Sequence, residues 1–205
     1  MPLPSPLPLF PLQAVLFPGG ALGLKVFEAR YLDLITRCLR EQQPFGVVCL
    51  TQGREVRQGA DDGPTRFEAL GTLAHLVEVD AEQSGLLRIR CSGGQRFRFE
   101  RAVTLPQGLW AAEDVTVLDA DPSQAPSAEL APAAQALARA LPAIRGRDPH
   151  WLSGEPRLDD AGWVANRWCE LLPISLQARQ RLLALDDPLA RLQVVHAFLA
   201  QQQLL

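Results

Sequence analysis

The chain has 205 residues, enough for one large or two small domains, and its 47% apolar and 21% charged content is that of a globular protein. A formal net charge of -3 gives no general attraction to nucleic acid or to anionic membranes. The sequence contains no apolar run of about 18 residues, and its proline-broken start lacks the basic region of a signal peptide, so we expect a cytoplasmic protein without a membrane segment.

Cysteine and histidine residues are few and scattered along the chain. The cysteines are Cys38, Cys49, Cys91 and Cys169. They lie in apolar stretches and form no CxxC pair, so we expect reduced core residues and neither a disulfide nor a metal site. Of the three histidines, His75 and His196 lie on apolar faces, where we expect core residues. The sequence therefore predicts no metal and no cofactor.

The first 41 residues predict an extended segment, a turn and a helix. Residues 7–12 alternate leucine with proline, which predicts an edge strand or an extended arm because proline cannot donate to a β-ladder. Pro18 and Gly19 suit the second and third positions of a type II turn, which we expect between two strands. Apolar residues at spacings of three and four then predict a helix. This apolar stripe consists of Phe27, Tyr31, Leu34, Ile35, Cys38 and Leu39.

Strand patterns fill the following part of the chain. Residues 45–50 form a short apolar run after Pro44, which predicts a buried strand, and a polar loop follows over about 51–66. Residues 70–79 alternate with a period of two. Residues 87–100 predict two strands that are joined or kinked at their glycines. With a last strand over 109–118, these elements favour mainly antiparallel neighbours in a partly closed barrel.

The remainder of the chain has a helical pattern. Residues 119–127 are rich in proline, serine and acid and predict a linker. Helices are expected over residues 128–141, 160–172, 176–185 and 188–203, with a loop over 144–156. Ser175 and the Asp187–Pro188 pair are start signals for the last two. The predicted class is α+β, with a β domain over 1–118, a linker over 119–127 and an α-helical subdomain over 128–205.

Two short motifs near the N-terminus carry a family resemblance. The first comprises Leu16, Phe17, Pro18 and Gly19, and the second Phe27, Glu28, Ala29, Arg30 and Tyr31. Together they resemble the paired LFPG and FEPRY signature of the N-terminal, substrate-binding domain of Lon proteases, with Ala29 where the signature usually has proline. The resemblance implies a PUA-like pseudobarrel followed by a helical subdomain. From the residues themselves, we expect the charges of Glu28 and Arg30 to be structural.

The chemistry of complete Lon proteases is not expected here. A P-loop needs Gly-x-x-x-x-Gly-Lys-Ser/Thr, and a Ser-Lys protease needs a lysine base. Lys25, the single lysine of the chain, lies in neither context. We therefore expect a non-catalytic recognition module that binds polypeptide segments or a protein partner, with no enzyme activity. Two alternatives stay open: an RNA-binding module, although nucleic acid is not the partner we expect, and a hydrolase that pairs a cysteine with a histidine.

Five arginines on the predicted strands near Gly93 and Gly94 are a candidate partner-binding strip. They are Arg88, Arg90, Arg96, Arg98 and Arg101, all expected on outward positions. Such a strip can follow phosphates, which is the basis of the RNA alternative. The other interpretation is a solvated strand face paired with Glu78, Glu82 and Glu100, and we favour it because few aromatic residues accompany the arginines. Trp151, in a predicted loop, is a further candidate for anchoring a partner or for covering the core.

Overall fold

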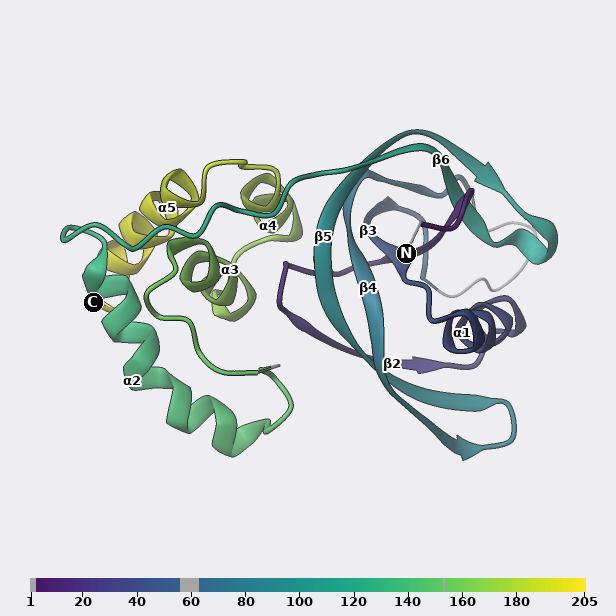
Figure 1. Ribbon diagram of the computed structural model, residues 1–205, viewed down its shortest axis with the longest axis horizontal. Coiled ribbons are helices and arrows are strands. Elements are labelled where there is room, and N and C mark those ends of the chain that lie inside the picture. Colours follow the sequence, from purple (N-terminus) through teal and green to yellow (C-terminus); the bar gives the residue numbers. More distant parts are fainter. Residues whose placement is uncertain (1–2, 56–62, 153) are drawn as a thin grey trace. The chain divides into compact units, whose positions relative to one another are not determined.

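The computed structural model describes residues 3–55, 63–152 and 154–205 and divides into two compact units (Figure 1). The β unit comprises Met1–Leu16 and Leu22–Asp119, and the helical unit comprises Phe17–Ala21 and Ala120–Leu205. The α+β class is confirmed. The unit boundaries differ from the predicted domain limits at two places. Segment Phe17–Ala21 belongs to the helical unit, and so does nearly all of the predicted linker 119–127.

The β unit is a closed barrel of strongly bent strands. Its described strands are β1 (Leu7–Leu12), β2 (Ala21–Val26), β3 (Phe45–Gln52), β4 (Arg66–Gln83), β5 (Leu86–Thr104) and β6 (Trp110–Val117). The sheet order is β2-β5-β4-β3-β1-β6, and a further pairing of β5 with β6 closes the barrel. β1 runs parallel to β3, whereas the β3–β4, β4–β5, β5–β6 and β1–β6 pairs are antiparallel. Residues 56–62 of the predicted loop lie outside the described part of the chain.

β1 does not lie at an edge, so the prediction of an edge strand or arm is wrong. It lies between β3 and β6, and all of its residues are buried. Its prolines fit because the two neighbours divide the strand between them. β6 pairs with Leu7 and Pro8, and β3 pairs with residues 9–12. Each part of β1 therefore has one principal partner, and a missing proline N–H costs little on the other side.

The predicted pair of strands around the glycines is one continuous strand, β5, which pairs with β4. The register shifts where Thr72 and Ala74 oppose Arg96 and Gly93, so β5 holds an extra residue there. A second shift, after Leu76, adds an extra residue to β4. Such bulges bend both strands, which lets two long strands wrap around the barrel.

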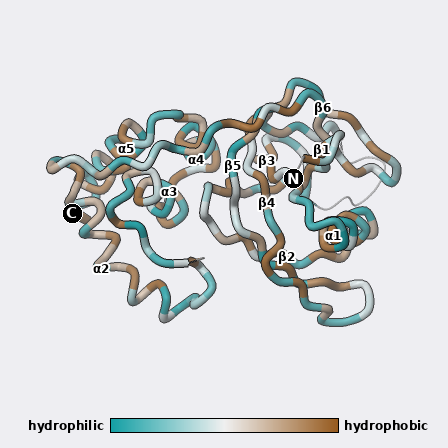
Figure 2. Tube along the Cα trace, viewed as in Figure 1, coloured by the Kyte–Doolittle hydropathy of each residue, from teal (hydrophilic) through white to brown (hydrophobic). Residues whose placement is uncertain are grey.

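Helix α1 (Ala29–Glu41) packs its apolar side into the β unit, and Figure 2 shows hydrophobic and hydrophilic residues alternating along it. Its central contact is Tyr31, whose ring stacks on Phe10 with 3.9 Å between centroids. The predicted stripe is wrong at both ends, because Phe27 is 53% and Leu39 is 55% exposed. Phe27 precedes the first helical residue. Leu39 follows the buried Cys38 and points about 100° further round the helix.

The helical unit contains α2 (Ala131–Arg147), α3 (Ala161–Leu171), α4 (Leu176–Leu183) and α5 (Pro188–Gln201). The three later helices begin where the sequence predicts, because Asp160, Ser175 and Asp187 each accept a hydrogen bond from a first-turn amide. α2 runs past Pro142 to Arg147, so the loop expected from residue 144 begins later. α3 is buried along most of its length between α2 and α5. None of the described helices has the length and hydropathy needed to cross a bilayer.

Candidate functional site

The first half of the signature forms the expected turn, but not between two strands. The Gly20 N–H donates to the Phe17 carbonyl at 2.9 Å, and Gly19 has a φ of 72°, as the third position of a type II turn requires. β1 ends at Leu12, so the turn connects a loop to β2. Just before the turn, the Leu16 carbonyl accepts a 2.6 Å hydrogen bond from the Thr72 hydroxyl of the β unit.

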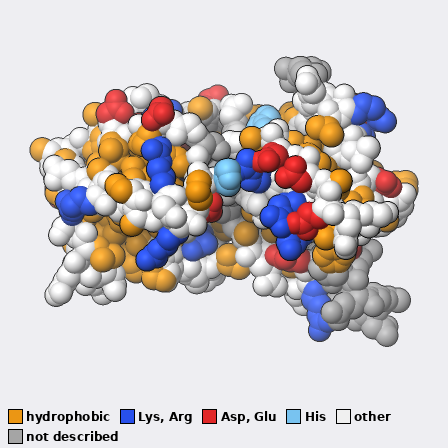
Figure 3. Space-filling model, turned by 90° about the horizontal axis from the view of Figure 1, so that it is seen from below, with side chains coloured by type: hydrophobic (Ala, Val, Ile, Leu, Met, Phe, Trp, Pro, Cys, Tyr) orange, Lys and Arg blue, Asp and Glu red, His pale blue; other side chains and the backbone are white. Residues whose placement is uncertain are grey.

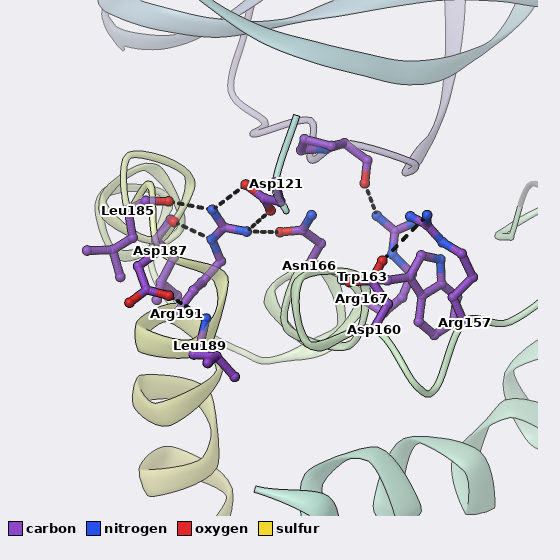
Figure 4. A network of polar contacts seen from close by, with 12 residues as sticks. Asp121, Arg157, Asp160, Trp163, Asn166, Arg167, Leu185, Asp187, Leu189 and Arg191 are labelled. Atoms are coloured by element: carbon purple, nitrogen blue, oxygen red, sulfur yellow. Dashed lines mark hydrogen bonds and ion pairs between the residues drawn. The ribbon is translucent and has the colours of Figure 1, made fainter. Parts of the chain in front are cut away.

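A fully buried arginine holds this turn within the helical unit (Figure 4). Arg167 of α3 donates from Nη1 to the Gly19 carbonyl at 2.5 Å and from Nη2 to the Pro18 carbonyl at 2.9 Å. The same Nη2 pairs with Glu170 Oε1 at 2.9 Å. No sequence signal distinguishes Arg167, because an arginine inside a helical pattern is usually solvated. The contacts explain why Phe17–Ala21 belongs to the helical unit.

Glu170 lies beneath the turn and restricts its composition. A Cβ at position 20 would collide with the Glu170 carboxylate and with the Phe17 carbonyl oxygen, so Gly20 is required by close approach. Burial raises the pKa of Glu170 to about 7, against the attraction of Arg167 and Arg179. Its Oε2 is buried and has no hydrogen-bond partner among the described residues. The desolvation of this carboxylate therefore outweighs the ion pair at Oε1.

This shift predicts that Glu170 makes stability fall as the pH rises. The pKa of Glu170 is near 4.5 in the unfolded state and about 7 in the folded state. Between these values the folded state binds more protons than the unfolded state, so the unfolding free energy falls as the pH rises, and the fall levels off above about pH 7. We expect the unfolding free energy of the wild type to fall relative to Glu170→Gln by about 1–3 kcal/mol from pH 4.5 to 7.5. Denaturant unfolding at several pH values measures this difference, in which other titrating groups cancel. A relative gain by the wild type would show that the ion pair dominates.

The second half of the signature fastens α1 to the β unit. Arg30 is 7% exposed, pairs with Glu28 at 2.9 Å and donates to the Gly108 carbonyl at 2.9 Å. Its guanidinium also lies 4.5 Å from the centroid of the Tyr31 ring. Ala29 is the first helical residue and is exposed, a position at which proline is equally acceptable. These contacts give the charges of Glu28 and Arg30 a structural role, while Phe27 is left exposed.

The five strand arginines do not form a free basic strip. Arg88 pairs with Glu82, and Arg90 with Glu78. Figure 3 shows basic and acidic side chains interspersed on the face that it presents. Arg96 is 4% exposed, so its predicted outward position is wrong; it lies at the register shift, where the alternation of faces is disturbed.

The two other arginines of the set are exposed. Arg101 pairs with Glu113 at 2.6 Å, whereas Arg98 has no acidic partner among the described residues. The strand face is therefore largely charge-balanced.

Trp151 lies between α2 and α3, half-buried, and its amide donates to the Asp148 carbonyl at 3.2 Å. It belongs to the other compact unit and does not extend the arginine set.

The cysteines and histidines do not combine into a site within the described residues. All four cysteines are free and buried, as expected. Burial raises the pKa of Cys38 to about 11 and those of Cys91 and Cys169 to about 12, so they stay thiols. The prediction of core histidines is wrong for His75, which is exposed and whose ring lies over Gly94. The described part of the chain shows no cluster of three potential metal ligands.

An apolar opening lies between α4 and α5, and we call it the α4–α5 groove. Its volume is about 360 Å³. The lining consists of Leu172, Ile174, Ser175, Gln177, Ala178, Arg181, Leu182, Leu185, Val194, Val195 and Phe198. Val194 is 52% exposed, and Phe198 is half-buried one turn further along α5. The groove therefore offers aliphatic and aromatic surface to a ligand from within one compact unit.

Sequence reasoning missed this groove, although α5 carries a signal for it. The predicted core face of α5 contains Leu192, Val195 and Leu199, which are buried. Val194 and Phe198, four residues apart, form a second apolar stripe beside that face. One core covers only one of the two apolar faces of such a helix, so the uncovered stripe is a candidate binding surface.

Comparison with known proteins gives a consistent result. The family model described as "ATP-dependent protease La (LON) substrate-binding domain" matches residues 6–201. A Lon protease of Anaeromyxobacter dehalogenans is 25% identical over 198 residues, which is 94% of this chain and 23% of the relative. A Lon protease of Paraburkholderia phytofirmans is 32% identical over 96 residues, covering 46% of this chain and 11% of the relative. The chain thus spans less than a quarter of the curated relatives it matches.

Solved structures agree with that assignment. The crystal structure of a Lon N-terminal domain protein from Xanthomonas campestris is 36% identical, has a TM-score of 0.73 and covers 93% of this chain and 96% of its own. The N-terminal domain of a Mycobacterium avium complex Lon protease, 15% identical with a TM-score of 0.56, covers 92% and 95% and supports the fold. The chain therefore belongs to the family of Lon protease substrate-binding domains.

Proposed function

We propose that this protein is a non-catalytic recognition module that binds apolar polypeptide segments, or a protein partner that displays one, in the α4–α5 groove. The observation that carries the proposal is the opening itself, about 360 Å³ and lined mostly by aliphatic and aromatic side chains. An apolar groove of this size gains free energy by removing a ligand's apolar side chains from water. Membership of a substrate-binding family supports the same role.

The described residues give less support to the alternatives. An RNA-binding surface needs arginines that are free to meet phosphates, whereas Arg88 and Arg90 are engaged by acidic neighbours and Arg96 is buried. A cysteine hydrolase needs a thiolate, whereas burial keeps the described cysteines as thiols. Neither alternative gains a specific observation from the structure.

A charge placed in the groove tests the proposal. We expect Val194→Asp to weaken binding of a fluorescently labelled, reduced and carboxymethylated unfolded protein by about tenfold or more, because a carboxylate in an apolar groove must be desolvated. Fluorescence anisotropy titration measures the affinity. Val194 is 52% exposed, so the substitution leaves the core of the helical unit intact.

Val77→Asp is the matched control. Val77 is 61% exposed but lies on β4 of the β unit, so the same change of side chain occurs outside the groove. We expect its affinity for the unfolded protein to equal that of the wild type. Equal affinity of all three proteins would reject the groove as the binding site, and no binding by the wild type would reject the proposed function.

A further inference from the structure

One charged side chain lines the α4–α5 groove, and the proposed binding of apolar segments gives it no role. Among the described residues that line the groove, Arg181 alone is charged. Arg181 is exposed and has no ion-pair or hydrogen-bond partner in the described part of the chain. Helix α4 contains no acidic residue that would neutralise it. The groove therefore presents a positive charge beside apolar surface.

A carboxylate of a bound peptide could pair with Arg181 either from the peptide's C-terminus or from an acidic side chain within it. The position of Arg181 along the groove distinguishes the two. Ser175 and Ala178 line the groove before it, and Leu182 and Leu185 line it after it. At about 1.5 Å per helical residue, Arg181 lies roughly 4–5 Å from Ala178 along α4, with apolar lining on both sides. A bound peptide that ended at Arg181 would leave the part of the groove beside Leu185 empty. A bound peptide that continued past Arg181 would fill both parts of the groove.

We propose that the α4–α5 groove selects apolar polypeptide segments that carry an acidic side chain within the apolar run, and that Arg181 pairs with that carboxylate. The inference rests on the proposed function and adds the chemistry of the segment. The apolar walls supply most of the affinity, and the arginine distinguishes acidic from neutral and basic segments. A basic segment is disfavoured because it would bring a second cation against Arg181.

Peptides with both ends blocked test this selection without a terminal charge. One apolar peptide is prepared with Asp, Asn or Lys at its centre, and the Asn peptide is also prepared with a free C-terminal carboxylate. In anisotropy titrations at low salt we expect the wild type to bind the Asp peptide about fivefold more tightly than the blocked Asn peptide, as a partly exposed ion pair allows. The Lys peptide should bind most weakly.

Arginine variants assign the selection to one side chain. Arg181→Gln should bind the Asp and Asn peptides equally, and Arg181→Glu should prefer the Lys peptide. Arg139→Gln is the matched control, since Arg139 is an exposed arginine on α2 that does not line the groove. It should keep the wild-type preference for Asp.

The outcomes separate this inference from the proposed function. If the Asp and Asn peptides bind equally and Val194→Asp weakens both, the groove binds apolar segments but the acidic selection is wrong. A preference for the free C-terminal carboxylate over the Asp peptide would also overturn it. If sedimentation velocity shows that the wild type is a dimer and Val194→Asp is a monomer, a second copy of the protein occupies the groove and the inference is rejected. If neither the peptides nor the unfolded protein bind, the proposed function itself falls.

Discussion

Replacing Arg167 by methionine is expected to lower the free energy of unfolding by about 3–5 kcal/mol, the range for removing one partner of a buried ion pair. Methionine roughly keeps the length of the side chain and removes its five donors. The Pro18 and Gly19 carbonyls then lose their side-chain donors, and Glu170 loses its ion-pair partner. The variant tests whether the signature turn owes its conformation to α3.

Tryptophan fluorescence during urea unfolding measures the loss of stability in the helical unit. Trp151, Trp163 and Trp168 lie in the helical unit, so the signal reports mainly its unfolding. The matched control is Arg157→Met, because Arg157 is 62% exposed and pairs with Asp160 at 3.5 Å. An exposed pair contributes less than about 1 kcal/mol. Similar losses in the two variants would show that Arg167 has no special structural role.

Adding Glu170→Gln to Arg167→Met separates two parts of the loss. The double variant removes the carboxylate that the single variant leaves buried without its close cation. We expect it to recover a part of the stability, while the unpaired carbonyls of the turn keep it below the wild type. Full recovery would mean that the carbonyls of Pro18 and Gly19 contribute nothing.

The parts of the fold that depend on local chemistry were predictable from the sequence. Ser175 and Asp187 start their helices because a short polar side chain can accept a hydrogen bond from the first turn. Pro18 and Gly19 form a type II turn because their allowed backbone conformations require it. These residues determine their own local conformation, and Pro18 and Gly19 are also part of the motif that carries the family resemblance.

Other features depend on contacts between distant parts of the chain, which spacing does not reveal. β1 resembles an edge strand in sequence, yet closure of the barrel gives it a neighbour on each side. Arg96 follows the alternation of an exposed face, yet a register shift places it among buried residues. Arg167 looks like a solvated helical arginine, yet the two carbonyls that it binds lie 148 and 149 residues earlier in the chain. The α4–α5 groove likewise needs two helices to be placed side by side.

Arg191 is the second residue whose role only the fold reveals, and Arg191→Met is expected to lower the free energy of unfolding by about 3–5 kcal/mol. The side chain is 1% exposed. It pairs with Asp121 at 2.5 Å, donates to Asn166 Oδ1 at 3.0 Å and donates to the Leu182 carbonyl at 3.0 Å (Figure 4). It also donates to the Leu185 carbonyl. One guanidinium thus joins α5 to α3, to the end of α4 and to the segment that precedes α2.

The same substitution is expected to weaken binding in the α4–α5 groove, because Leu182 and Leu185 both line it and both are held by Arg191. Arg191→Lys should be intermediate in stability, since an ammonium keeps the charge but lacks the planar fork that reaches several acceptors at once. Arg139→Met, an exposed arginine of α2, is the control and should change the unfolding free energy by less than about 0.5 kcal/mol. Urea unfolding followed by tryptophan fluorescence, and anisotropy titration with the unfolded protein under folded conditions, measure the two effects. A stable Arg191→Met variant with wild-type affinity would show that packing of α4 against α5, without this arginine, is enough to form the groove.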